Sequence, residues 1–126
     1  MTAHAPTPAQ LDRFGAALKL RRGAMVSELA RLDGSMLTVR ESRGDGVADD
    51  EHDPEGPTMS SEWSRLTGTR EALERDLAAV ERSLTRLGEG RYGFCARCGK
   101  RISTARLEAR PEAELCIDCA SAAEQG

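Results

Sequence analysis

Four cysteines, arranged as two pairs, most strongly constrain how this 126-residue chain can fold. Each pair has two residues between its cysteines, and seventeen residues separate the pairs, which are Cys95 with Cys98 and Cys116 with Cys119. Two thiolates three positions apart can bind one face of a tetrahedral ion, and two such pairs complete a closed four-sulfur shell. The spacing therefore predicts one structural Zn²⁺ ion bound by these four residues.

Disulfide bonds and redox chemistry are the alternative uses of these cysteines. Disulfides are typical of secreted proteins, but residues 1–10 lack the basic region and apolar core of a signal peptide. A redox pair would be expected inside a βαβ pattern, and neither pair has one. A closed four-sulfur shell leaves no position for a reactive water, and both histidines are isolated. We therefore expect a cytoplasmic protein that is not an enzyme and does not span a membrane.

Apolar residues recur at alternating steps of three and four in two long stretches, which indicates two helices that pack along one narrow seam. In the first stretch, Leu11, Leu18, Met25, Leu32 and Val39 are seven residues apart. A second row completes the steps of four and three and is interrupted once by an arginine: Gly15, Arg22, Leu29 and Met36. The second stretch is Met59, Trp63, Leu66, Arg70, Leu73, Leu77, Val80, Leu84 and Leu87. Only 3% of the residues are aromatic, which suits such a seam better than a thick core. The predicted fold is mainly α: an antiparallel coiled-coil helical hairpin followed by a small C-terminal four-cysteine zinc finger.

The domain organisation follows from these stretches. Residues 1–6 are expected to be a flexible tail, and residues 7–90 the hairpin, which begins at a Thr7 N-cap. Three glycines and two prolines place a tip loop at 42–57. Residues 91–126 are expected to form the zinc-finger module, with a short helix over Cys116 to Ala123.

The apolar rows also predict a register between the two helices. Matched pairs in this register include Leu11 with Leu87, Leu18 with Val80 and Leu32 with Leu66. The same alignment brings Arg22 near Asp76 and Arg70 near Glu28, so that each arginine in the seam meets an acid.

Charge is unevenly distributed along the chain. The tip loop contains six acids and no base between residues 44 and 57: Asp45, Asp49, Asp50, Glu51, Asp53 and Glu55. Residues 91–110 contain one acid and six bases: Arg91, Arg97, Lys100, Arg101, Arg106 and Arg110. The acids can serve solubility alone or approach a bound Mg²⁺ or a basic surface. The bases can neutralise the zinc–thiolate centre or bind phosphates.

The finger region resembles the TraR/DksA family of bacterial zinc-finger transcription regulators. The motifs that carry the resemblance are Tyr92-Gly93-x-Cys95-x-x-Cys98-Gly99, Arg106-Leu107-x-Ala109-x-Pro111 and Cys116-x-x-Cys119. The resemblance implies a regulator that binds RNA polymerase, inserts the coiled-coil tip into the secondary channel and modulates initiation. It also implies no contact with specific DNA bases. Some members act together with the nucleotide ppGpp, which makes ppGpp a candidate partner.

The tip residues implied to contact polymerase are Asp49, Asp50, Glu51, Asp53 and Glu55. The best-studied members carry Asp-x-x-Asp-x-Ala at the tip, where this chain has Asp53, Gly56 and Thr58. Two other functions remain open: a zinc finger that binds nucleic acid through its basic residues, and a coiled-coil adaptor for another protein.

Overall fold

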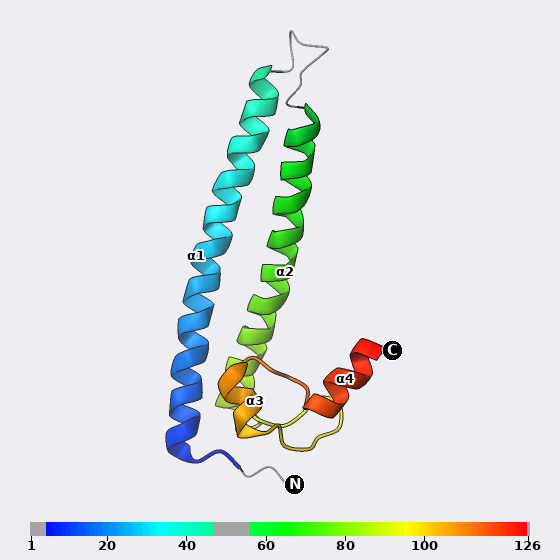
Figure 1. Cartoon of the computed structure of the whole chain (residues 1–126). Helices are drawn as coiled ribbons and strands as arrows, with labels where there is room; N and C mark the ends of the chain where they lie inside the picture. Colours follow the sequence, from blue (N-terminus) through cyan, green and yellow to red (C-terminus); the bar gives the residue numbers. More distant parts are fainter. Residues whose placement is uncertain (1–4, 47–55, 126) are drawn as a thin grey trace. The chain divides into compact units, whose positions relative to one another are not determined.

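The computed structural model describes residues 5–46 and 56–125, and within these ranges the fold is mainly α, as predicted (Figure 1). The helices are α1 (Pro8–Gly46), α2 (Gly56–Gly88), α3 (Thr104–Ala109) and α4 (Ile117–Gln125). The only β-type pairing among the described residues is an isolated bridge between Phe94 and Arg101. None of the helices found there has a segment both long and apolar enough to cross a bilayer.

The start of α1 confirms the predicted N-cap. The backbone N–H of Gln10 donates to the Thr7 hydroxyl at 3.1 Å, and the backbone N–H of Thr7 donates to the Gln10 side-chain oxygen at 2.8 Å. This reciprocal capping box satisfies two donors near the helix start, and such a cap typically contributes about 1 kcal/mol. Pro8 follows as the first helical residue, where its missing N–H costs no hydrogen bond.

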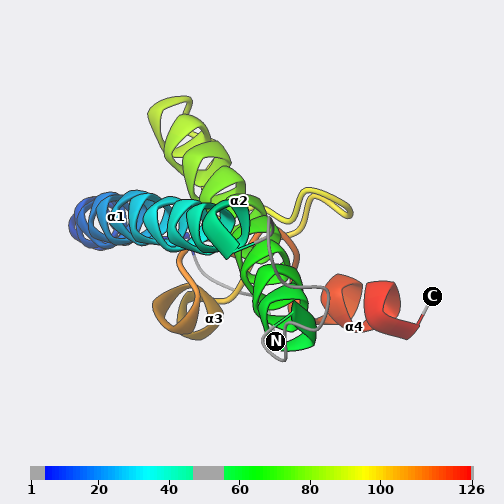
Figure 2. The same cartoon turned by 90° about the horizontal axis from the view of Figure 1, so that it is seen from above.

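The chain forms two compact units, each of which includes part of α1 and part of α2. The finger unit comprises Met1–Gly23 and Asp76–Gly126, and the tip unit comprises Ala24–Arg75. Within each unit the two helices run in opposite directions (Figure 1). In the finger unit, α4 points away from α1 and α2, as the view from above also shows (Figure 2).

The finger unit has a well-buried core. Its apolar members are Phe14, Leu18, Val80, Tyr92, Cys95, Ile102, Leu107 and Ala113. The rings of Phe14 and Tyr92 pack with their centroids 5.7 Å apart, and the Tyr92 hydroxyl donates to the Pro111 carbonyl at 2.8 Å. Burial, and secondarily the charge of Glu112, raises the pKa of Tyr92, so the phenol stays protonated and remains a donor. Tyr92 thereby ties the finger to the N-terminal part of α1.

The tip unit is more sparsely packed. Among the side chains described there, only Leu32 and Leu66 are buried apolar residues. In the same unit, the Arg70 guanidinium lies 2.6 Å from an oxygen of Asp33 on α1 and also pairs with Glu74 on its own helix. Arg70, the one polar residue in the apolar row of α2, is therefore paired with acids on both helices.

The predicted register is wrong by about one helical turn. Arg70 pairs with Asp33 instead of Glu28, and Arg22 lies 3.9 Å from Glu81 instead of near Asp76. Both observed partners lie five positions beyond the expected ones.

Backbone packing in the finger unit shows a similar offset, of four positions. A Cβ placed on Gly15 would lie 2.9 Å from Cδ2 of Leu87, the residue expected opposite Leu11. Because Gly15 has no side chain, the Leu87 side chain can approach the backbone of α1 closely there. The alternation of apolar residues did not predict this contact.

The loop predicted at 42–57 is too long at both ends, because α1 continues to Gly46 and α2 already begins at Gly56. Glycine weakens a helix by about 1 kcal/mol without ending it, which explains the extension of α1. Pro57 falls in the first turn of α2, where a missing N–H is tolerated.

Candidate metal centre

The structure brings the four predicted cysteines together. Their Sγ atoms all lie within 4.8 Å of one another, and no disulfide joins them. The Sγ atoms of Cys98 and Cys116, one from each pair, are 3.8 Å apart. Zinc–sulfur bonds of about 2.3 Å in a tetrahedron require sulfurs about 3.8 Å apart, so the cluster fits one structural zinc ion.

The first cysteine pair lies on a tight turn. The Cys95 N–H donates to the Lys100 carbonyl at 2.7 Å, and the Gly99 N–H donates to the Cys95 carbonyl at 2.9 Å. Gly99 has φ +78°, a backbone conformation that other residues rarely adopt. This glycine therefore lets the chain turn back immediately after Cys98.

Backbone N–H groups stabilise thiolates in both pairs. The Arg97 N–H donates to the Cys95 sulfur at 3.4 Å, and the Cys119 N–H donates to the Cys116 sulfur at 3.5 Å. Cys116 directly precedes α4, which begins at Ile117.

The thiols of Cys95 and Cys119 do not ionise equally readily. Burial is the largest single influence on Cys95 and opposes ionisation, but hydrogen bonds from the backbone at Cys98, Cys116 and Arg97 together lower its pKa to about 6. A hydrogen bond to Cys116, followed by burial, raises the pKa of Cys119 to about 12. Crowded thiols cannot all lose their protons without a cation among them, which is further reason that the cluster fits a metal.

Backbone contacts join the segments that carry the two pairs. The Ala96 N–H donates to the Glu114 carbonyl at 2.7 Å, and the Arg106 side chain donates to the Leu115 carbonyl at 2.8 Å. Arg106 belongs to α3, whose first turn is capped by the Ser103 hydroxyl. This short helix was not predicted, although serine before Thr104 is a usual N-cap signal.

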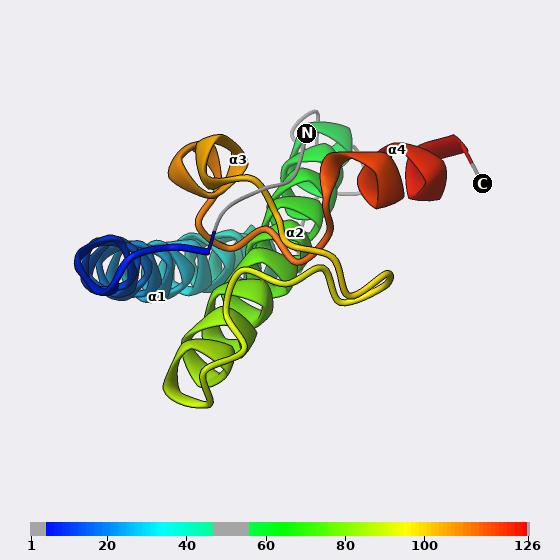
Figure 3. The same ribbon diagram turned by 90° about the horizontal axis from the view of Figure 1, so that it is seen from below.

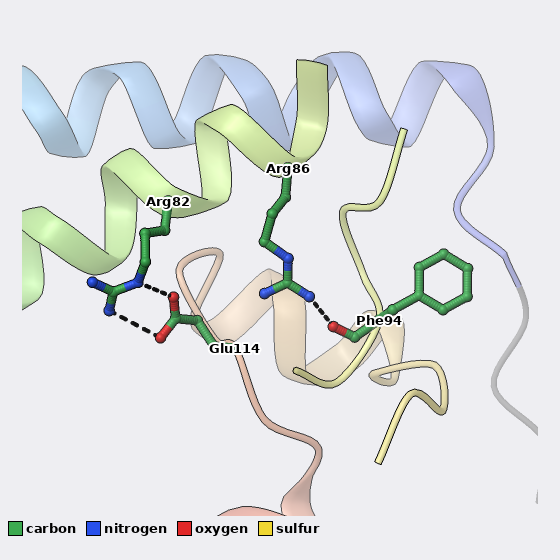
Figure 4. Close-up of polar contacts among 4 residues, drawn as sticks. All are labelled: Arg82, Arg86, Phe94 and Glu114. Atoms are coloured by element: carbon green, nitrogen blue, oxygen red, sulfur yellow. Dashed lines mark hydrogen bonds and ion pairs between the residues drawn. The ribbon is translucent and has the colours of Figure 1, made fainter. Parts of the chain in front are cut away.

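Two arginines of α2 hold the finger (Figure 4). The Arg82 guanidinium binds both carboxylate oxygens of Glu114, at 2.5 and 3.0 Å, and Arg86 donates to the Phe94 carbonyl. The view from below shows the segments around Phe94 and Glu114 passing beside α2 (Figure 3). One arginine thus holds the segment before each cysteine pair.

Glu112 connects the same segment to α1. Its carboxylate is 4% exposed and lies 2.5 Å from the Arg21 guanidinium and 3.9 Å from that of Arg110. Neither carboxylate oxygen has a hydrogen bond of ordinary geometry, so the charge is compensated by proximity to two cations. We name Glu112 with Arg21, and Glu114 with Arg82, the acidic clasp. The sequence did not reveal it, because each arginine lies more than thirty residues from its glutamate along the chain.

The other predicted site residues have different outcomes. The five tip acids, Asp49, Asp50, Glu51, Asp53 and Glu55, lie outside the described residues. Four of the six bases of the finger have partners within the chain. Arg91 pairs with Glu89, Arg110 lies near Glu112, Arg106 binds a carbonyl, and Arg101 lies 4.6 Å from the centre of the Phe94 ring. These contacts indicate that much of the basic charge serves the finger itself.

A closed four-thiol cluster attached to antiparallel helices defines a C4-type zinc-finger protein. Residues 90–125 match the family model of the prokaryotic dksA/traR C4-type zinc finger. Over 116 residues, the chain is 31% identical to the RNA polymerase-binding transcription factor DksA of Salmonella typhimurium, covering 92% of this chain and 72% of that protein. The chain therefore belongs to the TraR/DksA family.

Two further similarities agree with this assignment. The protein of the same name from Haemophilus influenzae is 39% identical over 67 residues, which span 53% of this chain and 46% of that protein, less than half its length. Among solved structures, transcription factor DksA2 from Pseudomonas aeruginosa superposes with a TM-score of 0.75 at 23% identity, covering 94% of this chain and 85% of the other. That likeness supports the fold alone.

Proposed function

We propose that this chain is a transcription regulator that binds RNA polymerase and modulates initiation. The observation that carries the proposal is the similarity over 92% of the chain to a relative named as an RNA polymerase-binding transcription factor. We further propose that the chain acts in the cytoplasm and by binding, without catalysing a reaction. A cytoplasmic location suits a cluster of unbridged thiols, because that compartment keeps thiols reduced.

In this proposal, Cys95, Cys98, Cys116 and Cys119 hold one structural Zn²⁺. The ion, when bound, supplies a cross-link between the two cysteine pairs and neutralises thiolate charge. The chain's own residues orient the thiols through backbone N–H groups and attach the finger to α1 and α2 through the acidic clasp.

The tip is proposed to enter the secondary channel of polymerase, as the family resemblance implies. Supporting this role, the tip unit carries twelve acids and six bases, a formal charge of −6, whereas the finger unit carries nine acids and twelve bases, a charge of +3. The acids proposed to contact polymerase are Asp49, Asp50, Glu51, Asp53 and Glu55. Because Gly56 and Thr58 replace two residues of the best-studied tips, the effect on initiation is expected to differ in size or sign. A role for ppGpp is also proposed from the resemblance alone.

The test measures binding to purified RNA polymerase and transcription in vitro. The variant carries Asp49→Asn, Asp50→Asn and Asp53→Asn. A matched control neutralises three exposed acids of the finger unit instead, through Asp12→Asn, Asp76→Asn and Glu124→Gln. Both variants change the net charge equally, so any difference reflects position.

We expect the wild-type chain and the control to bind polymerase and alter transcription, and the tip variant to lose the effect on transcription while retaining its helical content. A wild-type chain that does not bind polymerase would overturn the proposed function. An unchanged effect in the tip variant would overturn only the proposed role of these acids.

A further inference from the structure

An open groove with a volume of about 700 Å³ lies between α1 and α2 within the tip unit. Met36, Leu37 and Trp63 supply its apolar surface, and Arg40, Arg70 and Glu71 are among its polar lining residues. The volume falls within the range of cavities that take a small ligand, and it is large enough for one or two side chains of a partner.

The groove exposes the apolar side chain of Leu37, which belongs to neither apolar row of the predicted seam. Leu37 is 50% exposed and lines the groove together with Trp63, the single tryptophan of the chain. Tryptophan, methionine and arginine are enriched at protein–protein interfaces, and tryptophan and arginine at the positions that contribute most to affinity. This groove brings Trp63, Met36 and two arginines together.

Charge indicates what kind of surface would fit. The groove belongs to the unit with a formal charge of −6, and its Glu71 side chain is exposed. Arg70 is already paired with Asp33 and Glu74, so it adds little attraction for an acidic partner. Three acids and two bases line the groove, so a basic partner would be attracted to it more than an acidic one.

We propose that the groove is a docking site for RNA polymerase, at a place where polymerase presents an apolar side chain flanked by lysine or arginine. This inference rests on the proposed function and adds a second contact to that of the acidic tip. The apolar side chain would pack against Leu37 and Trp63, while the flanking cations would approach Glu71 and the neighbouring acids.

The test compares Leu37→Gln with Val26→Gln. Both native side chains are 50% exposed and both lie on α1 in the tip unit, but only Leu37 lines the groove. Affinity for RNA polymerase is measured by titration, and circular dichroism checks that each variant keeps its helical content. We expect Leu37→Gln to weaken binding about tenfold or more and Val26→Gln to change it less than about twofold.

A second measurement uses the single tryptophan. In chain labelled with 5-fluorotryptophan, Trp63 gives one ¹⁹F resonance, which is expected to shift or broaden with polymerase in the wild type much more than in Leu37→Gln at the same concentrations. Two results would overturn the proposed role of the groove while leaving the proposed function intact. One is a Leu37→Gln variant that binds polymerase as tightly as the wild type. The other is an equal loss of affinity in Leu37→Gln and Val26→Gln. Absence of binding by the wild type itself would instead overturn both the role of the groove and the proposed function.

Discussion

The finger unit and the tip unit use the same two helices but are stabilised differently. In the finger unit, eight apolar side chains are buried and the acidic clasp joins the finger to both helices. In the tip unit, two described apolar side chains are buried, and the charged side chains of Arg70 and Asp33 connect the helices. The comparison indicates that a chain with few aromatic residues concentrates its stability where a metal and a clasp supplement a small core.

Net charge separates the two units as well. The tip unit carries −6 and the finger unit +3, so the modest total of −3 conceals opposite surfaces. The tip unit has the larger excess of like charge, and repulsion among those charges destabilises its compact state. This effect adds to the difference in packing between the two units.

Removing zinc should give the largest effect and should test whether the two units are independent. Structural zinc contributes on the order of 10 kcal/mol to zinc-finger peptides, so a chelator or Cys95→Ser should abolish amide protection across residues 92–120. Helical protection in the tip unit should persist. Hydrogen exchange measured by mass spectrometry distinguishes the units, and restoring zinc to the chelated wild type should recover protection. Full protection of the finger without zinc would contradict the metal assignment.

Truncating one core leucine in each unit should sharpen the difference in packing. Leu18 is fully buried in the finger unit and Leu32 is 3% exposed in the tip unit. Leu→Ala changes in cores cost about 2–5 kcal/mol, and we expect Leu18→Ala near the upper end because its neighbours are also held in place. Leu32→Ala should cost less, because the sparser surroundings can close over the cavity. Urea unfolding measures the loss of unfolding free energy in both variants. Equal losses would contradict the proposed difference in packing between the two units.

Glycine-to-alanine changes should have opposite steric consequences in the two units. A Cβ placed on Gly34 or Gly68, in the tip unit, would meet no atom within 4 Å beyond its own stretch of helix, so alanine should stabilise the helix by about 1 kcal/mol at each. Gly15→Ala should gain less or nothing, because its Cβ would lie 2.9 Å from Leu87. Thermal melting ranks the three variants, and a larger gain at Gly15 would show that Leu87 moves aside freely.

Acid should produce the smallest effect, through the exposed ion pairs of the tip unit. The Arg70 guanidinium lowers the pKa of Asp33, and Arg31 lowers that of Glu28. A carboxylate with a lowered folded-state pKa stabilises the fold above its unfolded-state pKa and loses that contribution as the pH falls through the folded-state value. Stability should therefore decline below about pH 4, and Asp33→Asn should flatten the decline. The test is to measure the urea midpoint of the wild type and of Asp33→Asn from neutral pH down through this acid range. If the two midpoints fall in parallel, the ion pair of Asp33 with Arg70 does not cause the decline.

The cysteine spacing was sufficient to predict the metal cluster, because two residues between thiols leave little freedom in how each pair binds one ion. The register was not predictable in the same way. A long arginine side chain can reach acids on neighbouring turns, so Arg70 was expected near Glu28 but pairs with Asp33. The acidic clasp was missed because Arg21 and Arg82 carry no local signal of their distant partners.

The acidic clasp restricts which changes in chain length this protein can accept. Glu112 and Glu114 are separated by one residue, yet they bind arginines on different helices. Inserting or deleting a single residue between them would displace one carboxylate from its helix. Natural length variation is therefore expected to avoid this short segment.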